Sequence, residues 1–124
     1  MSLVCRGIRG ATTATANTKE AILEATREML QRLVAANKLR TEDIAAAVFT
    51  TTRDLNAEFP AAAARQMGWE YVALLDSHEM EVPGALPSCI RALVLVNTEK
   101  QANELVNVYL RGAVNLRARG TEDK

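Results

Sequence analysis

The chain has 124 residues, which is enough for one domain with a small hydrophobic core. Its 15 basic and 15 acidic side chains balance, so no net charge favours nucleic acid or a membrane surface as a partner. No apolar run approaches the roughly 20 residues that a membrane span needs, and the N-terminus lacks a signal-peptide pattern. We therefore expect a single cytoplasmic domain over residues 1–124.

Residue types that hold metals or form disulfides are few. Cys5 and Cys89 both lie in apolar, strand-like stretches, which favours reduced thiols in the core over a disulfide or a metal site. The single histidine, His78, has no cysteine or carboxylate cluster at ligand spacing, which argues against zinc. We expect no metal and no other cofactor.

The first predicted element is a strand from Val4 to Thr13. Its side chains alternate between two sets, Val4, Arg6, Ile8 and Gly10 on one face and Cys5, Gly7 and Arg9 on the other. Arg9 shares one face of this strand with Cys5 and Gly7, whose small size leaves room beside the guanidinium. A glycine weakens a strand interior unless a backbone or a ligand must approach closely. We interpret the stretch as an anion-binding strand. The alternative is an edge strand with solvated arginines and with glycines that mark a bulge.

A helix of about five turns is predicted next, ending near Asn37. Asn17 and Glu20 have the spacing of a capping box, with asparagine in place of the usual serine or threonine. Glu28 and Arg32 stand four residues apart, so we expect them to form an ion pair on the solvated face. The apolar stripe of this helix consists of Ile22, Leu23, Ala25, Met29, Leu30, Leu33, Val34 and Ala36.

The middle of the chain is predicted to hold two strands and a short helix. β-Branched and aromatic residues favour a strand over Ile44–Thr52, although three alanines within it favour a helix. The segment Phe59–Gly68 is typical of a short helix, with Pro60 in its first turn. Trp69–Leu75 is predicted as a third strand, followed by a polar loop over Asp76–Glu81.

The most apolar run of the chain, Cys89–Val96, is predicted as a central strand. Arg91 is its only charged residue. A guanidinium in a central strand needs partners, because an unpaired buried charge costs several kcal/mol. Arg91 is therefore the strongest single-residue indication of a ligand site or an ion pair.

The order of these elements is strand, helix, strand, helix, strand, loop and strand, which indicates an α+β fold. We expect one domain with a mixed sheet, helices on one face, an ordered core over about 4–117 and a mobile polar tail over 118–124. The other face of the sheet would stay apolar and uncovered, which favours oligomerisation.

The residues that could form a site are rich in fixed cations and poor in groups that shuttle protons. No nucleophile triad, activated cysteine, phosphate loop or dinucleotide glycine pattern occurs in the sequence. Arginine stays charged, so it is a poor general base, but it binds carboxylates in a bidentate fork. Such a set suits a dianionic small molecule, and catalysis by orientation and electrostatics rather than by proton transfer. The candidates are Arg9, Arg65, Arg91, Arg117, Glu79 and Tyr109.

Several stretches, taken in order, resemble one enzyme family. They are Arg6-Gly7-Ile8-Arg9-Gly10-Ala11-Thr12-Thr13, Asp54-Leu55 with Phe59-Pro60-Ala61, Gly68-Trp69-Glu70-Tyr71-Val72, Glu79-Met80, Cys89-Ile90-Arg91 and Val108-Tyr109-Leu110. From about Val4 to Arg117 the chain is similar to the monofunctional α/β class of chorismate mutase. The resemblance implies a homotrimer with a pseudo-α/β-barrel core and an active site at each subunit interface. It also implies cofactor-free rearrangement of chorismate to prephenate, on the branch toward phenylalanine and tyrosine.

The resemblance implies roles for individual residues as well. Arg91 would stabilise the negative charge that grows on the ether oxygen of chorismate. Glu79 would accept a hydrogen bond from the ring hydroxyl and help to orient Arg91. Phe59 and Arg65 would come from the neighbouring subunit. The expected substrate-binding residues are Arg9 and Tyr109 at a carboxylate, Phe59 and Leu116 against the ring, Leu75 and Asp76 beside the substrate, and Arg65 and Arg117 at the mouth.

Two positions depart from the family pattern. Ala62 stands where a lysine can occur, so one cation at the mouth is missing. Asp76 stands where a small cysteine or serine is common, so a second carboxylate joins Glu79 near the bound dianion. Two other functions stay open. One is a trimeric imine deaminase of the small α+β kind, and the other is a non-catalytic trimer that senses an acid of the aromatic pathway.

Overall fold

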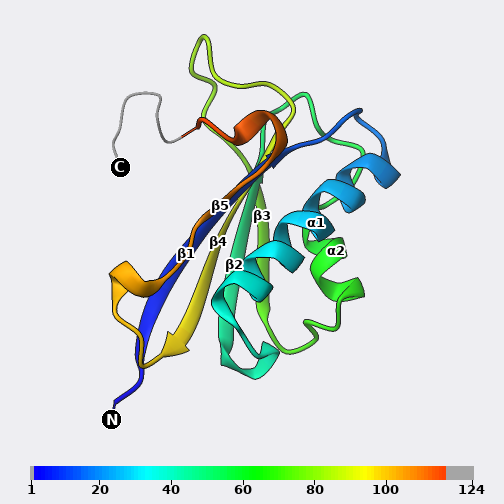
Figure 1. The fold of residues 1–124 in the computed structure, drawn as a ribbon. Helices are drawn as coiled ribbons and strands as arrows, with labels where there is room; N and C mark the ends of the chain where they lie inside the picture. The colour runs from blue at the N-terminus through cyan, green and yellow to red at the C-terminus, as the bar shows by residue number, and fades with distance from the viewer. Residues whose placement is uncertain (1, 117–124) are drawn as a thin grey trace.

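The computed structural model describes residues 2–116 (Figure 1). Helices separate its strands along the chain, except that the third strand is followed directly by the fourth. The strands are β1 (Val4–Thr13), β2 (Ile44–Thr51), β3 (Ala73–His78), β4 (Cys89–Thr98) and β5 (Val108–Tyr109). The helices are α1 (Lys19–Asn37) and α2 (Ala61–Gln66), with short 3-10 helices η1 (Thr41–Asp43), η2 (Ala102–Glu104) and η3 (Arg111–Ala113).

The strands form a mixed sheet in the order β3-β2-β4-β1-β5. Strand β4 runs antiparallel to β1 and to β2, whereas β3 is parallel to β2 and β5 is parallel to β1. The predicted α+β fold with a mixed sheet and a central β4 is therefore confirmed. The predicted tail over 118–124 lies outside the described residues.

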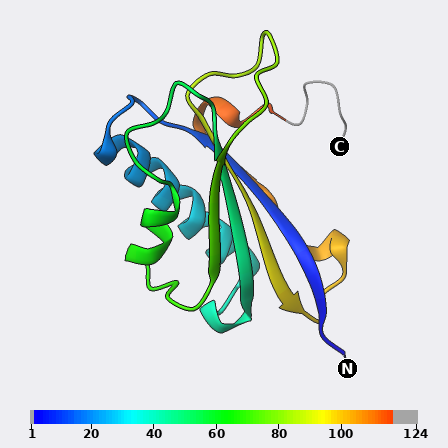
Figure 2. The ribbon, with the colours of Figure 1, turned by 180° about the vertical axis from the view of Figure 1, so that it is seen from behind.

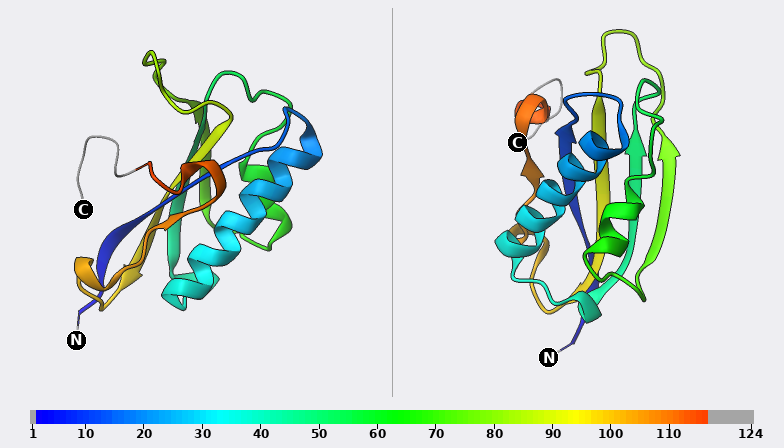
Figure 3. Two further views of the ribbon diagram at one scale, coloured as in Figure 1. Left: turned by 45° about the horizontal axis from the view of Figure 1, so that its top comes forward. Right: turned by 90° about the vertical axis from the view of Figure 1, so that its right-hand side faces the viewer.

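Both α-helices lie on one face of the sheet. In the right-hand view of Figure 3 both helices lie in front of the strands, and Figure 2 shows both of them to the left of the sheet. Helix α1 comes close to β1 because Gly10 has no side chain there: a Cβ would lie 3.2 Å from the Met29 side chain. The helix layer and the sheet enclose the core, whose fully buried side chains include Ile8, Ile22, Met29, Leu30, Leu33, Phe49, Ile90, Val94 and Val96.

The N-terminal cap of α1 differs from the prediction by one residue. Thr18, in an extended conformation, is the cap, and its hydroxyl accepts a hydrogen bond from the Ala21 amide at 3.1 Å. The Asn17 side chain is used elsewhere, because its oxygen accepts from the amides of Asn56 and Ala57 at 2.9 and 3.0 Å. Asn17 thus ties the start of the helix to the loop that leads to α2.

The predicted ion pair between Glu28 and Arg32 is also wrong, because Glu28 has a different partner. Glu28 instead pairs with Arg111 of η3 at 2.9 Å, a residue 83 positions away in the chain. The predicted apolar stripe is otherwise buried or half-buried, except for Ala36, which is exposed in the last turn.

Strand β3 begins four residues later than predicted. Residues 69–72 form a turn in which Trp69 and Val72 are buried, and β3 then runs from Ala73 to His78. The polar residues Asp76 and His78 were expected in a loop. They are tolerated in β3 because it is an edge strand, paired on one side only with β2.

The face of the sheet opposite the helices is uncovered in this chain, as predicted. Register partners make continuous rows across it: Leu75 of β3 lies beside Val48 of β2, which lies beside Leu93 of β4, which lies beside Arg9 of β1. Leu75 is 62% exposed and Leu93 is 41% exposed. We call this surface the open face. Cys5 also projects there and is exposed, so the expectation of two core thiols holds only for the buried Cys89. None of the helices within residues 2–116 has the length and apolarity to traverse a bilayer.

Candidate active site

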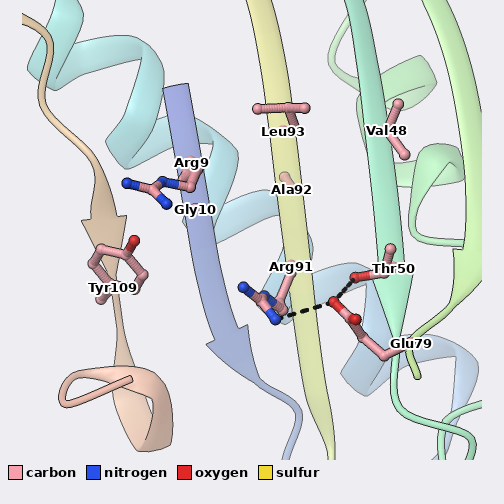
Figure 4. A pocket seen from close by; sticks show the side chains of 9 residues that line it. All are labelled: Arg9, Gly10, Val48, Thr50, Glu79, Arg91, Ala92, Leu93 and Tyr109. Carbon is pink, nitrogen blue, oxygen red and sulfur yellow. Dashed lines mark hydrogen bonds and ion pairs between the residues drawn. The ribbon is translucent and has the colours of Figure 1, made fainter. Parts of the chain in front are cut away.

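Four of the predicted site residues line one pocket of about 360 Å³ on the open face (Figure 4). Arg9 belongs to β1, Arg91 to β4 and Tyr109 to β5, and Glu79 directly follows β3. These strands lie far apart in sequence but are neighbours through the pairing of β1 with both β4 and β5. The remaining lining residues are Gly10, Val48, Thr50, Ala92 and Leu93.

The centre of the pocket is an ion pair between Arg91 Nη1 and Glu79 Oε2, 3.2 Å apart. The Thr50 hydroxyl donates to the same carboxylate oxygen at 2.8 Å. Thr50 and Arg91 are register partners of β2 and β4, so both side chains project from the same face. The partner that Arg91 was expected to need is present. Its side chain is nevertheless 47% exposed, because it points away from the helix-covered core.

Arg9 and Tyr109 form the opposite side of the pocket. The backbone amide of Arg9 donates to the Asn107 side chain at 2.8 Å, which fixes the approach to β5. Tyr109 pairs with Ala11 of β1, so its ring lies beside the strand that carries Arg9. Figure 4 shows the Arg9 guanidinium and the Tyr109 ring beside the same space as Arg91. Among the described residues, the Arg9 guanidinium has no ion pair or hydrogen-bond partner.

Gly7 does not leave the space that we expected beside Arg9. A Cβ at Gly7 would lie 3.3 Å from the Leu93 side chain and 3.7 Å from that of Leu95. The missing side chain therefore accommodates leucines of β4 rather than a ligand at this position. The space beside the Arg9 guanidinium is instead the pocket on the open face, which Arg9 itself lines.

The charges of the pocket favour an anionic ligand. Two guanidinium groups face one carboxylate, and no histidine is among the described residues that line the cavity. Cys89, two residues before Arg91, offers no nucleophile at neutral pH, because burial raises the pKa of its thiol to about 11. Residues 2–116 contain no cluster of three or more His, Cys, Asp or Glu side chains placed to hold a metal ion. The pocket can orient an anion and stabilise developing negative charge, and the only carboxylate among its described lining residues, Glu79, is paired with Arg91.

The other predicted substrate-binding residues lie elsewhere in the chain. Phe59 and Asp76 line a second pocket of about 300 Å³ beside the start of α2. Arg65 lies at a third, more polar hollow with Trp69. Leu75 projects from β3, and Leu116 is half-buried in the turn after η3. Arg117 lies outside the described residues. A single chain therefore brings together Arg9, Glu79, Arg91 and Tyr109, but it does not bring Phe59, Arg65 and Asp76 to them.

Asp76 has a contact that the sequence did not reveal. Its Oδ1 accepts the amide hydrogen of Ala61, the first residue of α2, at 3.0 Å. Pro60, at the cap position of α2, provides no side-chain hydrogen bond, so Asp76 supplies the missing acceptor. Burial raises the pKa of the Asp76 carboxyl, while the Ala61 amide and Arg65 act in the opposite direction. In this chain Asp76 does not share the pocket of Glu79.

Thr50 is the polar residue among the described lining of the pocket that sequence reasoning missed. The run Thr50-Thr51-Thr52 served only as a sign of β structure, since β-branched residues favour strands. The available signal was the alternation of burial along β2. Phe49 and Thr51 point into the core, so Thr50 must share the opposite face with Arg91 on the neighbouring strand.

Comparison with known proteins adds the family. The model of the family described as chorismate mutase type I matches residues 5–119, nearly the whole chain. The chain is a member of the type I chorismate mutase family. It is 50% identical to the chorismate mutase AroH of Thermus thermophilus over 113 residues, which cover 90% of this chain and 93% of that protein.

Two further comparisons agree with membership of this family. The chorismate mutase AroH of Bacillus subtilis (strain 168) is 40% identical over 116 residues, covering 93% of this chain and 91% of that protein. A solved structure of a chorismate mutase from Clostridium thermocellum superposes with a TM-score of 0.85 at 46% identity, covering 86% of this chain and 96% of the other. The family resemblance found in the sequence is thus confirmed.

Proposed function

We propose that the pocket on the open face is the part of a chorismate mutase site that binds the substrate and stabilises its transition state. As a member of this family the protein is an isomerase that converts chorismate to prephenate, a step of aromatic amino acid biosynthesis. The observation that carries the assignment of the site is the cluster of Arg91, Glu79, Arg9 and Tyr109 around one cavity. The location of the protein in the cytoplasm stays a prediction.

The chemistry of the rearrangement fits this cluster. The reaction breaks an ether bond and forms a carbon–carbon bond in one concerted step, with no proton to transfer. Negative charge grows on the ether oxygen as its bond breaks, and a cation fixed there binds the transition state more tightly than the substrate. In the proposal, Arg91 is that cation, and Glu79 and Thr50 hold its guanidinium in a fixed orientation. Arg9, with no partner among the described residues, is free to bind a carboxylate with Tyr109 beside it.

The second part of the proposal is that a neighbouring copy completes the site in a homotrimer. The pocket lies on the open face, where Leu75 and Leu93 are exposed in the single chain. Phe59 is 65% exposed although its ring is large and apolar. Covering the open face with another copy would bury these side chains. It would also bring Phe59, Arg65, Leu75 and Asp76 of one subunit toward Arg91 of the next, with Leu116 and Arg117 contributed by the C-terminal segment.

The test is direct. Purified protein is incubated with chorismate, and prephenate is measured against the uncatalysed rearrangement, with and without a chelator. We expect turnover that the chelator leaves unchanged, and loss of turnover in Arg91→Ala with trimers still present by light scattering. Binding of chorismate without formation of prephenate would instead support the non-catalytic sensor. Absence of both binding and turnover would contradict the proposed site.

A further inference from the structure

The last residue of β2 and the residue after it form hydrogen bonds near both members of the central ion pair. The Thr51 carbonyl accepts the backbone amide hydrogen of Glu79 at 2.8 Å. Next in the chain, Thr52 exchanges two hydrogen bonds with Cys89, the first residue of β4: its amide donates to the Cys89 carbonyl, and its hydroxyl oxygen accepts from the Cys89 amide, both at 3.0 Å. Glu79 and the start of the strand that carries Arg91 are therefore positioned by adjacent residues.

Asp54 completes this arrangement. One carboxylate oxygen accepts the hydrogen of the Thr52 hydroxyl, and the other accepts the amide hydrogen of Ser88 at 2.9 Å. A hydroxyl has one hydrogen to donate. Because Asp54 takes it, the lone pairs of the Thr52 oxygen remain for the Cys89 amide. The hydrogen bond from Thr52 also keeps the pKa of Asp54 below its ordinary value, so the carboxylate is charged at neutral pH.

Ser88 shows why such an acceptor is needed. Its φ of 52° lies in the left-handed region, which residues with a Cβ disfavour. Asp54 holds the amide of Ser88, and the Ala14 amide donates to the Ser88 carbonyl at 2.9 Å. This turn is where the chain leaves the exposed loop 80–87 and enters β4, three residues before Arg91. A change of backbone angle at Ser88 would move the start of β4 relative to Glu79.

We infer that Asp54 is a positioning residue for the mutase reaction, which orients Arg91 by holding Thr52 and the left-handed turn at Ser88. The inference rests on the proposed role of Arg91. Asp54 is not among the residues that line the pocket, and its hydrogen bonds within the described residues go to Thr52 and Ser88 rather than to Arg91 or Glu79. Asp54 does line a neighbouring hollow together with Glu79, but its effect on Arg91 passes through the backbone of β4. Loss of the carboxylate leaves Ser88 free to return to a more favourable conformation and loosens the geometry on which transition-state stabilisation depends.

The experiment compares Asp54→Ala with Arg53→Ala, a matched change in the same turn. Arg53 has only an ion pair at 3.5 Å with Glu81, and both side chains are mostly exposed. We expect Asp54→Ala to lower kcat about tenfold with a smaller change in KM, because orientation matters most in the transition state. Arg53→Ala should stay within twofold of the parent protein. An Asp54→Ala enzyme within twofold of the parent would overturn the inference.

A second substitution separates positioning from general loss of structure. Glycine adopts the left-handed conformation without penalty, so Ser88→Gly added to Asp54→Ala should recover most of the lost kcat. Failure of the double variant to recover would overturn the inference, since a general loss of stability would not be cured at this position. If Asp54→Ala does not fold, Asp54→Asn replaces it, because an amide can keep one of the two acceptor contacts but not both.

Amide hydrogen exchange provides a readout that does not depend on the mutase activity. Exchange at Ser88 and Cys89 should accelerate in Asp54→Ala and not in Arg53→Ala. Faster exchange at Ser88 and Cys89 together with unchanged kcat would show that Asp54 holds the turn but does not orient Arg91, which would overturn the inference. An inactive parent protein would contradict the proposed function itself. The exchange rates at Ser88 and Cys89 would still test the role of Asp54 in the turn, because they are measured without substrate.

Discussion

The carboxylate of Glu79 accepts two contacts at one oxygen, Oε2: the Arg91 guanidinium at 3.2 Å and the Thr50 hydroxyl at 2.8 Å. The three groups come from β4, from the residue after β3, and from β2, so their geometry depends on the pairing of three strands. The ion pair with Glu79 orients the Arg91 guanidinium, and the side chain is 47% exposed, so the guanidinium is still accessible to a ligand. That combination suits electrostatic catalysis, in which a fixed charge needs no reorganisation during the reaction.

Arg91→Lys tests whether the geometry of this charge matters. We expect kcat to fall by about two to three orders of magnitude, because one donor directed at a developing oxyanion contributes about 3–4 kcal/mol to transition-state stabilisation. Lysine keeps the charge but cannot contact Glu79 and an oxygen of the substrate with one planar fork. Steady-state kinetics on the folded variant decide the matter, and a lysine enzyme within tenfold of the parent would show that charge alone suffices.

Thr50→Val tests the support of the ion pair. Valine has nearly the shape of threonine but leaves Glu79 with Arg91 alone. Loss of a hydrogen bond to a charged group costs about 1.5 kcal/mol or more, which corresponds to about tenfold in rate when the loss is felt in the transition state. We expect kcat to fall by about that factor. Thr50→Ser is the control: it keeps the hydroxyl and should retain most of the activity. Equal rates for the valine and serine variants would contradict a role for the hydroxyl.

Elements with a clear hydrophobic period were predictable from the sequence. Helix α1 and strands β1, β2 and β4 lie where their patterns indicate. Strand β3 was misplaced because Trp69 and Val72 have side chains typical of a strand but are buried in a turn, while Asp76 is polar but belongs to an edge strand. Local preference could not distinguish these cases, since the packing that decides them comes from distant residues.

The candidate site was predictable in its charged residues and not in its spatial arrangement. Arg91 stood out as a lone charge in an apolar run, and Arg9 and Tyr109 became its neighbours through the pairing of β1 with β4 and β5. Thr50 was missed because its role follows from strand register, which the sequence does not state. The contact between Asp76 and the Ala61 amide was missed for a similar reason: it joins an edge strand to a helix that precedes it in the chain.

Asp76→Asn tests the electrostatics of that contact. Burial raises the pKa of Asp76 in the folded protein, so the native state binds the proton more tightly than the unfolded state. The contribution of this group to stability is therefore fully present below the unfolded pKa of about 4 and is lost as pH rises through the folded pKa. Asparagine removes that loss and can still accept from the Ala61 amide.

The melting temperature of Asp76→Asn should thus exceed that of the parent protein at pH 7, and the two values should converge as the pH approaches about 3. Thermal unfolding followed by circular dichroism across this range is the measurement. A variant less stable than the parent at pH 7 would mean that the charged form is favoured in the folded protein, through the Ala61 amide and Arg65.

Subunit complementation tests whether a neighbouring copy completes the site. Two single variants are prepared separately: Phe59→Asp changes one proposed wall of the site, and Arg91→Ala changes the other. Phe59 is 65% exposed and the Arg91 side chain is 47% exposed in the single chain, so neither change removes a core residue. Each variant is expected to be inactive alone, because each destroys one wall in every site. The two are unfolded, mixed in equal amounts and refolded, and trimers are verified by light scattering.

Random assembly fixes the expected outcome. In a closed three-fold ring the contacts are heterologous, so the two walls of each site come from different chains. A site is intact when its first wall comes from the Arg91→Ala chain and its second from the Phe59→Asp chain. Each choice has a probability of about one half in an equal mixture, so about a quarter of the sites should recover activity. If Phe59 and Arg91 served a site within one chain, every site would carry one lesion, and the refolded trimers would remain inactive.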